Sequence, residues 1–165
     1  MSVLAALPLV FAMAAPGTLV ARPHFSLTLP GRWLEQQSDE GVAYATLDGQ
    51  TQVIITVLEA RSSLSATDLN VAVDRLLELR RSSIQQMAGG KAEFNNIAEP
   101  VGPGLTRRAT MGVDPSHSVR FFVSIQGTPS KVVTVTFYRY SLRGSASEFQ
   151  QWAQRIIGSL TLGGA

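Results

Sequence analysis

Short runs of alternating apolar and polar residues, closed by turn-forming dipeptides, constrain this chain more than any other feature. Alternation with a period of two is the pattern of a strand with one covered face. Pro30-Gly31 and Asp48-Gly49 each follow such a run, and an Asp-Gly turn suits a hairpin. The pattern predicts two antiparallel meanders, with strands within residues 24–29, 33–37, 42–47, 53–58, 106–113, 119–125 and 131–138.

One helix is predicted after each meander. Ser65 with Asp68, and Ser145 with Glu148, have the spacing of a capping box at a helix start. Gly89-Gly90 supplies a residue that tolerates left-handed backbone and ends the first helix after about six turns. The apolar face of that helix is expected to comprise Leu69, Val73, Leu76, Ile84 and Met87. The apolar face of the closing helix is expected to comprise Phe149, Trp152, Ala153, Ile156, Ile157 and Leu160.

Strand runs separated by single helices, without a βαβ rhythm, predict an α+β fold. We expect one antiparallel β-sheet, built from the two meanders, with the two main helices packed on it. Because residues alternate along each strand, one face of the sheet is expected to be apolar and the other mixed.

The mixed face is the candidate binding surface. Tyrosine and arginine are enriched at interaction hot spots because each joins a large contact area to a polar end. The alternative is that the second helix or an N-terminal hairpin covers this face, so that its residues contact one another. The candidate binding residues are Tyr44, Arg108, Arg120, Phe122 and Tyr138.

The first residues form an apolar segment that resembles an export signal. Met1 to Gly17 carries no charged side chain, and Ala12-Met13-Ala14 matches the A-x-A pattern of a signal-peptidase site. The segment lacks the basic start of such signals and is too short for a membrane span, which takes about 20 residues. We therefore expect residues 1–23 to be a signal peptide or a disordered apolar tail, and residues 24–165 to be a single domain.

Composition excludes several classes of function. At 165 residues with a net charge of +2 and scattered arginines, the chain has the size of one domain and lacks the basic stripe of a nucleic-acid-binding protein. The absence of cysteine excludes disulfides, thiolate catalysis and thiolate metal sites.

No catalytic or metal-binding motif is recognisable. His24 and His117 lie far apart, whereas a zinc site takes three or four ligands. Gly89-Gly90-Lys91 lacks the other residues of a phosphate-binding loop, and no nucleophile elbow is present. We expect no catalytic residues, no metal and no cofactor.

The order of elements resembles a known family. "FSLTLPGRW" from Phe25 to Trp33, a VIITV strand, a long helix, "VVTVTFY" and a final helix ending in IIGSL resemble the PsbP-like fold, in its bacterial DcrB-type branch. The resemblance implies an α/β/α sandwich and a non-enzymatic role, as in envelope proteins, photosystem accessory subunits and secretion chaperones. The metal-binding residues of plant members have no matching histidine pair here.

Two functional hypotheses follow. The first is a binding or accessory protein of the bacterial envelope, periplasmic or secreted, whose partner is another protein or an apolar peptide segment. The second, favoured by the uncharged N-terminus, is a cytoplasmic chaperone or adaptor that shelters apolar helices of secretion-system effectors. The sequence leaves the partner and the oligomeric state open.

Overall fold

The computed structural model describes residues 17–99 and 104–163 of the chain. Within them, the elements of the larger sheet are β3 (Trp33–Gln36), β4 (Val42–Thr46), β5 (Thr51–Glu59), β6 (Glu93–Ile97), β7 (Thr106–Asp114), β8 (Val119–Thr128) and β9 (Lys131–Arg139). The smaller sheet comprises β1 (Thr18–Arg22), β2 (Phe25–Leu29) and β10 (Thr161–Leu162). The helices are α1 (Ala66–Met87) and α2 (Ala146–Ile157).

The larger sheet joins the two predicted meanders through one long pairing. Its strand order is β3-β4-β5-β9-β8-β7-β6, and every neighbouring pair is antiparallel. β5 of the first meander pairs along its whole length with β9 of the second. The predicted α+β fold, an antiparallel sheet with two helices packed on it, is confirmed.

The turns and helix starts follow local chemistry. Gly49 has a φ of +68°, which the Asp48-Gly49 turn between β4 and β5 requires and which few other residues tolerate. At the start of α2 the capping box is complete, because Glu148 accepts from the Ser145 backbone amide at 2.9 Å while its own amide donates to the Ser145 hydroxyl at 3.0 Å. At the start of α1 the box is only half formed.

The shorter carboxylate of Asp68 explains this difference. Asp68 donates its backbone amide to the Ser65 hydroxyl at 3.1 Å, as expected. Its carboxylate, however, accepts from that same hydroxyl at 2.6 Å and not from the Ser65 backbone amide. Aspartate is one methylene shorter than the glutamate of a standard box. The predicted reciprocal bond at Ser65 is therefore corrected to a side-chain pair.

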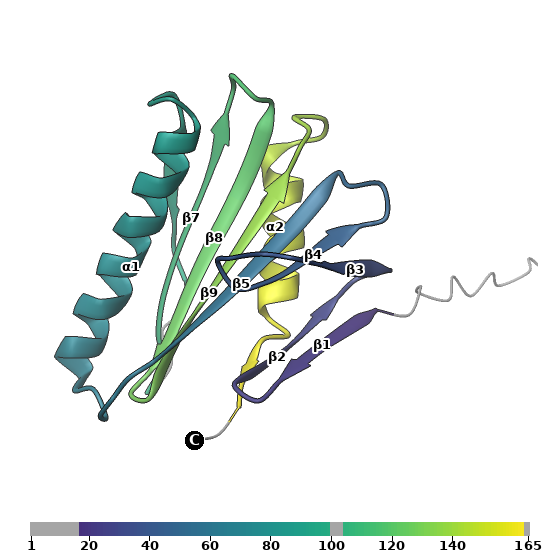
Figure 1. Ribbon diagram of the computed structural model, residues 1–165. Coiled ribbons are helices and arrows are strands. Elements are labelled where there is room, and N and C mark those ends of the chain that lie inside the picture. The colour runs from purple at the N-terminus through teal and green to yellow at the C-terminus, as the bar shows by residue number, and fades with distance from the viewer. Residues whose placement is uncertain (1–16, 100–103, 164–165) are drawn as a thin grey trace, which may run out of the picture.

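The two helices cover opposite faces of the larger sheet (Figure 1). α1 packs on β7 and β8, where Leu69, Val73 and Ile84 bury against Phe121 and Val123. α2 packs on the other face together with the small sheet. Two apolar cores result, one on each side of the sheet. No helix in the described part of the chain is both long and apolar enough to cross a membrane.

The ordered domain begins earlier than the sequence predicted. β1 pairs antiparallel with β2 over its full length, and Val20 is buried in the core against α2. Residues 18–23, which the prediction placed in a signal or tail, are therefore part of the fold. The cleavage site predicted near Ala14 lies outside the described residues, and a cut there would leave β1 intact.

Candidate functional site

A groove runs along α1 because this single helix covers only part of its face of the sheet. α1 lies over β7 and β8, while β9 and β5 continue the same face beyond the helix. Alternate residues of β5, namely Gln52, Ile54, Thr56 and Leu58, pair with β9 residues of that face. The side of α1 that looks toward β5 forms one wall of the groove, and β5 with β9 forms the other.

Three adjoining hollows make up this groove, which we call the α1 groove. Their volumes are about 560 Å³ at the N-terminal half of α1, 280 Å³ in the middle and 390 Å³ at its C-terminal end. The apolar helix wall comprises Leu76, Leu79, Ile84 and Met87. The apolar strand wall comprises Ile54, Leu58, Tyr138 and Tyr140.

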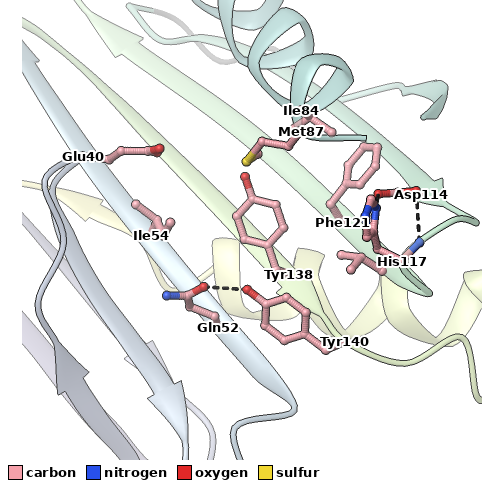
Figure 2. Close-up of a pocket in the computed structure, with 11 residues that line it drawn as sticks. Glu40, Gln52, Ile54, Ile84, Met87, Asp114, His117, Phe121, Tyr138 and Tyr140 are labelled. Atoms are coloured by element: carbon pink, nitrogen blue, oxygen red, sulfur yellow. Dashed lines mark hydrogen bonds and ion pairs between the residues drawn. The ribbon is translucent and has the colours of Figure 1, made fainter. Parts of the chain in front are cut away.

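Aromatic side chains line the C-terminal hollow (Figure 2) and neither of the other two. Ile54 and Phe121 lie on its sheet side, and Tyr140 donates its hydroxyl to Gln52 Oε1 at 2.8 Å. Tyr138 is buried and points its hydroxyl toward Met87 at the end of α1. Burial raises the pKa of Tyr138, so its hydroxyl stays protonated and neutral near pH 7.

An ion pair crosses the α1 groove between the C-terminal and middle hollows. Arg80 of α1 donates to Glu40, in the turn before β4, at 2.7 Å, and the Arg80 side chain is mostly buried. Thr56 of β5 donates its hydroxyl to the Glu40 carbonyl at 2.9 Å and fixes that turn on the sheet. Most of the lining at both ends of the groove is apolar, and this charge pair lies between them. Charged side chains also contribute to both ends, namely Glu59, Arg61, Arg75 and Lys131 in the N-terminal hollow and Asp114 and His117 in the C-terminal one.

An Asp114–His117 pair lies at the rim of the C-terminal hollow (Figure 2). The His117 Nδ1 is 2.6 Å from the Asp114 carboxylate, which also accepts from the backbone amides of Ser116 and His117. Burial raises the pKa of Asp114, but these hydrogen bonds outweigh it and hold that pKa below its ordinary value. The bonds close an Asx turn between β7 and β8.

This arrangement suits binding better than catalysis. The C-terminal hollow offers an acid–base pair but no serine, threonine, cysteine or lysine side chain as a nucleophile. Among the described residues, no group of three or more histidine or acidic side chains is placed to hold a metal ion. What the α1 groove offers is apolar area with a few fixed polar groups, the usual composition of a binding cleft.

The five candidate residues named from the sequence do not share one face. Direct pairing places Phe122 opposite Phe137, and Tyr44 opposite Val53, on the α2 side. It places Tyr138 opposite Phe121, and Arg108 opposite Ile125, on the α1 side. Arg120 lies on the same side as Phe122, because the two are separated by one residue of β8. The prediction of a single mixed face is therefore wrong.

Their contacts show why that face is not open. Phe122 is fully buried beneath α2 and the small sheet, and Tyr44 accepts a hydrogen bond from Arg22 of β1 at 2.9 Å. Arg120 donates to backbone carbonyls just before and at the start of α2. Arg108 pairs with Asp74 of α1 at 2.8 Å. Of the five, only Tyr138 lines the α1 groove.

Sequence reasoning missed the residues that shape the α1 groove most. Leu58, Leu79, Glu40 and Arg80 were not singled out. Met87, which the sequence analysis placed on the buried face of the helix, is 57% exposed at the groove rim. Leu77, which it left out of that face, is buried. The sequence did contain one signal for the groove. The apolar face of α1 is wider than packing on the sheet requires, because Leu76 and Leu79 extend it to one side.

The α+β fold is shared with solved structures of other proteins and is PsbP-like. The structure is similar to the solution structure of cyanobacterial PsbP (CyanoP) from Synechocystis sp. PCC 6803, with a TM-score of 0.65 and 11% identity over 96% of this chain and 98% of that one. A Bacteroides thetaiotaomicron VPI-5482 protein matches with a TM-score of 0.53 and 16% identity, over 92% of this chain and 50% of the other. No family model and no curated protein sequence matches the chain.

Proposed function

We propose that the protein is a non-enzymatic binding or accessory protein of the bacterial envelope, of the DcrB type, and that the α1 groove receives an apolar peptide segment of a partner protein. The observation that carries the proposal is the groove itself, an apolar cleft whose walls expose large side chains. Leu58, Leu79, Met87 and Tyr140 are each between 45% and 57% exposed and line adjoining hollows. Single exposed apolar residues are ordinary, whereas four that line adjoining hollows favour an interaction site.

The dimensions of the α1 groove favour a peptide segment over a small molecule. Its helix wall runs from Ala72 to Met87, which spans about 22 Å at a rise of 1.5 Å per residue. A helical segment of about four turns, with apolar side chains at its two ends, has that length. The Glu40–Arg80 pair in the middle is already satisfied, so an occupant needs to supply no charge there.

The test is site-specific crosslinking from inside the α1 groove. A photoreactive amino acid at Leu79 should give adducts with an apolar segment of one partner in living cells. The same amino acid at Val71 is the matched control, because Val71 lies on α1 outside the groove and is 61% exposed against 57% for Leu79. Equal adducts from both positions would contradict the proposal.

A charge in the groove should then weaken binding. Leu79→Glu should weaken binding of the crosslinked segment, measured by calorimetry, by about tenfold or more, because a carboxylate would be desolvated against apolar surface. Val71→Glu should leave the affinity within about twofold, and both variants should keep the thermal midpoint of the wild type. Unchanged affinity in Leu79→Glu would remove the groove as the binding site.

The subcellular location of the protein decides between the envelope role and the cytoplasmic alternative. Recovery of a chain shortened near Ala14 from the periplasm would support the envelope role. Recovery of the chain from the cytosol with Met1 intact would contradict it and favour the alternative, a chaperone or adaptor for secretion-system effectors. In both settings the groove would bind an apolar segment, so the crosslinking result is independent of the fractionation.

A further inference from the structure

A second feature, on the α2 side of the sheet, is an arginine held by aromatic rings. The guanidinium carbon of Arg139, at the end of β9, lies 4.7 Å from the ring centroid of Phe149 and 4.9 Å from that of Trp152. These cation–π contacts fix the position of the guanidinium. The rings contact the flat face of the guanidinium. The N–H groups point outward from its edge, and they stay available to donate hydrogen bonds.

This arginine has no counter-charge among the described residues. Arg22, Arg80, Arg81 and Arg108 each pair with a carboxylate, but no ion pair or hydrogen bond from the Arg139 side chain occurs within residues 17–99 and 104–163. Such a partly buried, fixed and uncompensated cation favours binding of an anion.

Arg120 adds a second positive charge beside it. The two arginines are directly opposite each other in β8 and β9. The N–H groups of Arg120 donate to backbone carbonyls, so no carboxylate balances its charge. The carboxylate of Glu148, at the start of α2, accepts from the Ser145 backbone amide and not from Arg120. Burial and the charge of Arg120 both lower the pKa of Arg139, which is the expected effect of unbalanced positive charge.

A cavity of about 620 Å³ opens at this point, which we call the arginine pocket. Thr51 of β5 is the direct strand partner of Arg139, and both lie on the sheet face opposite the α1 groove. All of its lining side chains can donate hydrogen bonds and none is a carboxylate, the lining residues being Gln50, Thr51, Arg139, Ser141 and Arg143.

We propose that the arginine pocket binds a phosphate group. Two guanidinium groups, two hydroxyls and one amide supply more donors than the two oxygens of a carboxylate can use, whereas the oxygens of a phosphate accept from several directions. Arginine forks match phosphate geometry, and the stacking of Arg139 on two rings holds one fork in place before the ligand arrives. The ligand is either a soluble phosphate ester or a lipid headgroup, which share this chemistry.

Inorganic phosphate is the first probe, in a titration followed by amide NMR at constant ionic strength against chloride. Phosphate should shift amide signals around Thr51, Arg139 and Ser141 in a saturable way that chloride does not reproduce. Arg143→Gln should weaken that binding about tenfold, because a charge-assisted hydrogen bond is lost. Arg143 is exposed and makes no ring contact, so this change should not disturb the fold.

The matched control is Arg155→Gln, which removes the same charge from an exposed position on α2 that does not line the pocket. It should leave phosphate affinity within about twofold. Equal losses in the two variants would mean that net charge alone attracts the anion, and would overturn the proposal. Equal shifts with phosphate and chloride would overturn it as well.

Two further probes separate the sources of phosphate. Glycerol 3-phosphate represents the soluble esters, and vesicles of phosphatidylcholine with 20% phosphatidic acid represent the lipid, where roughly that fraction gives an anionic surface. Tighter binding of the soluble ester than of inorganic phosphate, or vesicle retention that Arg143→Gln abolishes and Arg155→Gln does not, supports the proposal and identifies the source. Vesicle retention equal in both variants, with no binding of the ester, would refute it.

Discussion

Trp152→Ala tests how α2 is held on the sheet. The Trp152 ring stacks on Phe149 of the same helix at 5.8 Å, meets Phe137 of β9 edge-on at 5.2 Å, and stacks on Trp33 of β3 at 6.4 Å. It also forms one of the two faces that contact Arg139. Contacts within α2 and from α2 to β3 and β9 thus depend on one side chain.

The expected loss of stability can be estimated from these contacts. Replacing a buried tryptophan with alanine costs about 3–5 kcal/mol, and each aromatic pair contributes about 0.5–1.5 kcal/mol beyond its area. Trp152 is only partly buried, which lowers the first figure, while its three ring partners raise the total. We expect a loss of about 3 kcal/mol, a large part of the 5–15 kcal/mol that stabilises an ordinary domain.

Urea unfolding followed by far-ultraviolet circular dichroism measures this loss without relying on the removed fluorophore. With a typical slope of about 2 kcal/mol per molar urea, the midpoint should fall by about 1.5 M at an unchanged slope. Gln151→Ala on the exposed side of α2 is the control and should change stability by less than about 0.5 kcal/mol. A loss below about 1 kcal/mol for Trp152→Ala would refute the idea that this ring cluster holds α2 in place.

Three further changes test smaller features of the fold by the same urea titration. Ser145→Ala removes a complete capping box and should cost about 1 kcal/mol; no change would show that the cap is dispensable. Gly112→Ala should cost about 3 kcal/mol or more, since the new Cβ would lie 2.5 Å from Phe121 Cζ and closer still to the Glu93 carbonyl oxygen, and near-wild-type stability would contradict this register. The native pKa of Asp114 lies below its ordinary 3.8, so its stabilisation is present above that pH and lost as the pH falls through the native value. The stability gap between wild type and Asp114→Asn should therefore shrink as the pH falls below about 4, and a constant gap would contradict the assignment.

Local signals made much of the fold predictable from sequence. A dipeptide such as Asp48-Gly49 specifies its own turn, and Ser145 with Glu148 specifies its own helix start, because the interacting groups lie within a few residues of one another. The same reasoning failed for β1, because residues 18–22, assigned with the rest of residues 1–23 to a signal peptide or tail, pair with β2.

Which side chains of neighbouring strands lie on the same face of the sheet could not be predicted, because this depends on the register between the strands. Phe121 and Phe122 are neighbours in β8 and point to opposite faces. The sequence does not say whether Phe122 lies with Phe137 or with Tyr138 of β9, and a shift of one residue exchanges the two. The single mixed face was one such misassignment, and the α1 groove was hidden for the same reason, since it depends on β5 lying beside β9.

The width of the sheet explains why the α1 groove lies where it does. A helix is about 10 Å across with its side chains, and strands are about 4.8 Å apart, so one helix covers about two strands. On one face α2 is joined by the small sheet, and together they bury Phe25, Leu27 and Phe122 completely or nearly so. On the other face α1 lies mainly over β7 and β8, and in the described part of the chain no second helix packs on β5. The geometry therefore leaves room for one more helix beside α1, at the partly exposed Leu58 and Leu79. A partner segment bound there would complete the cover of this sheet face.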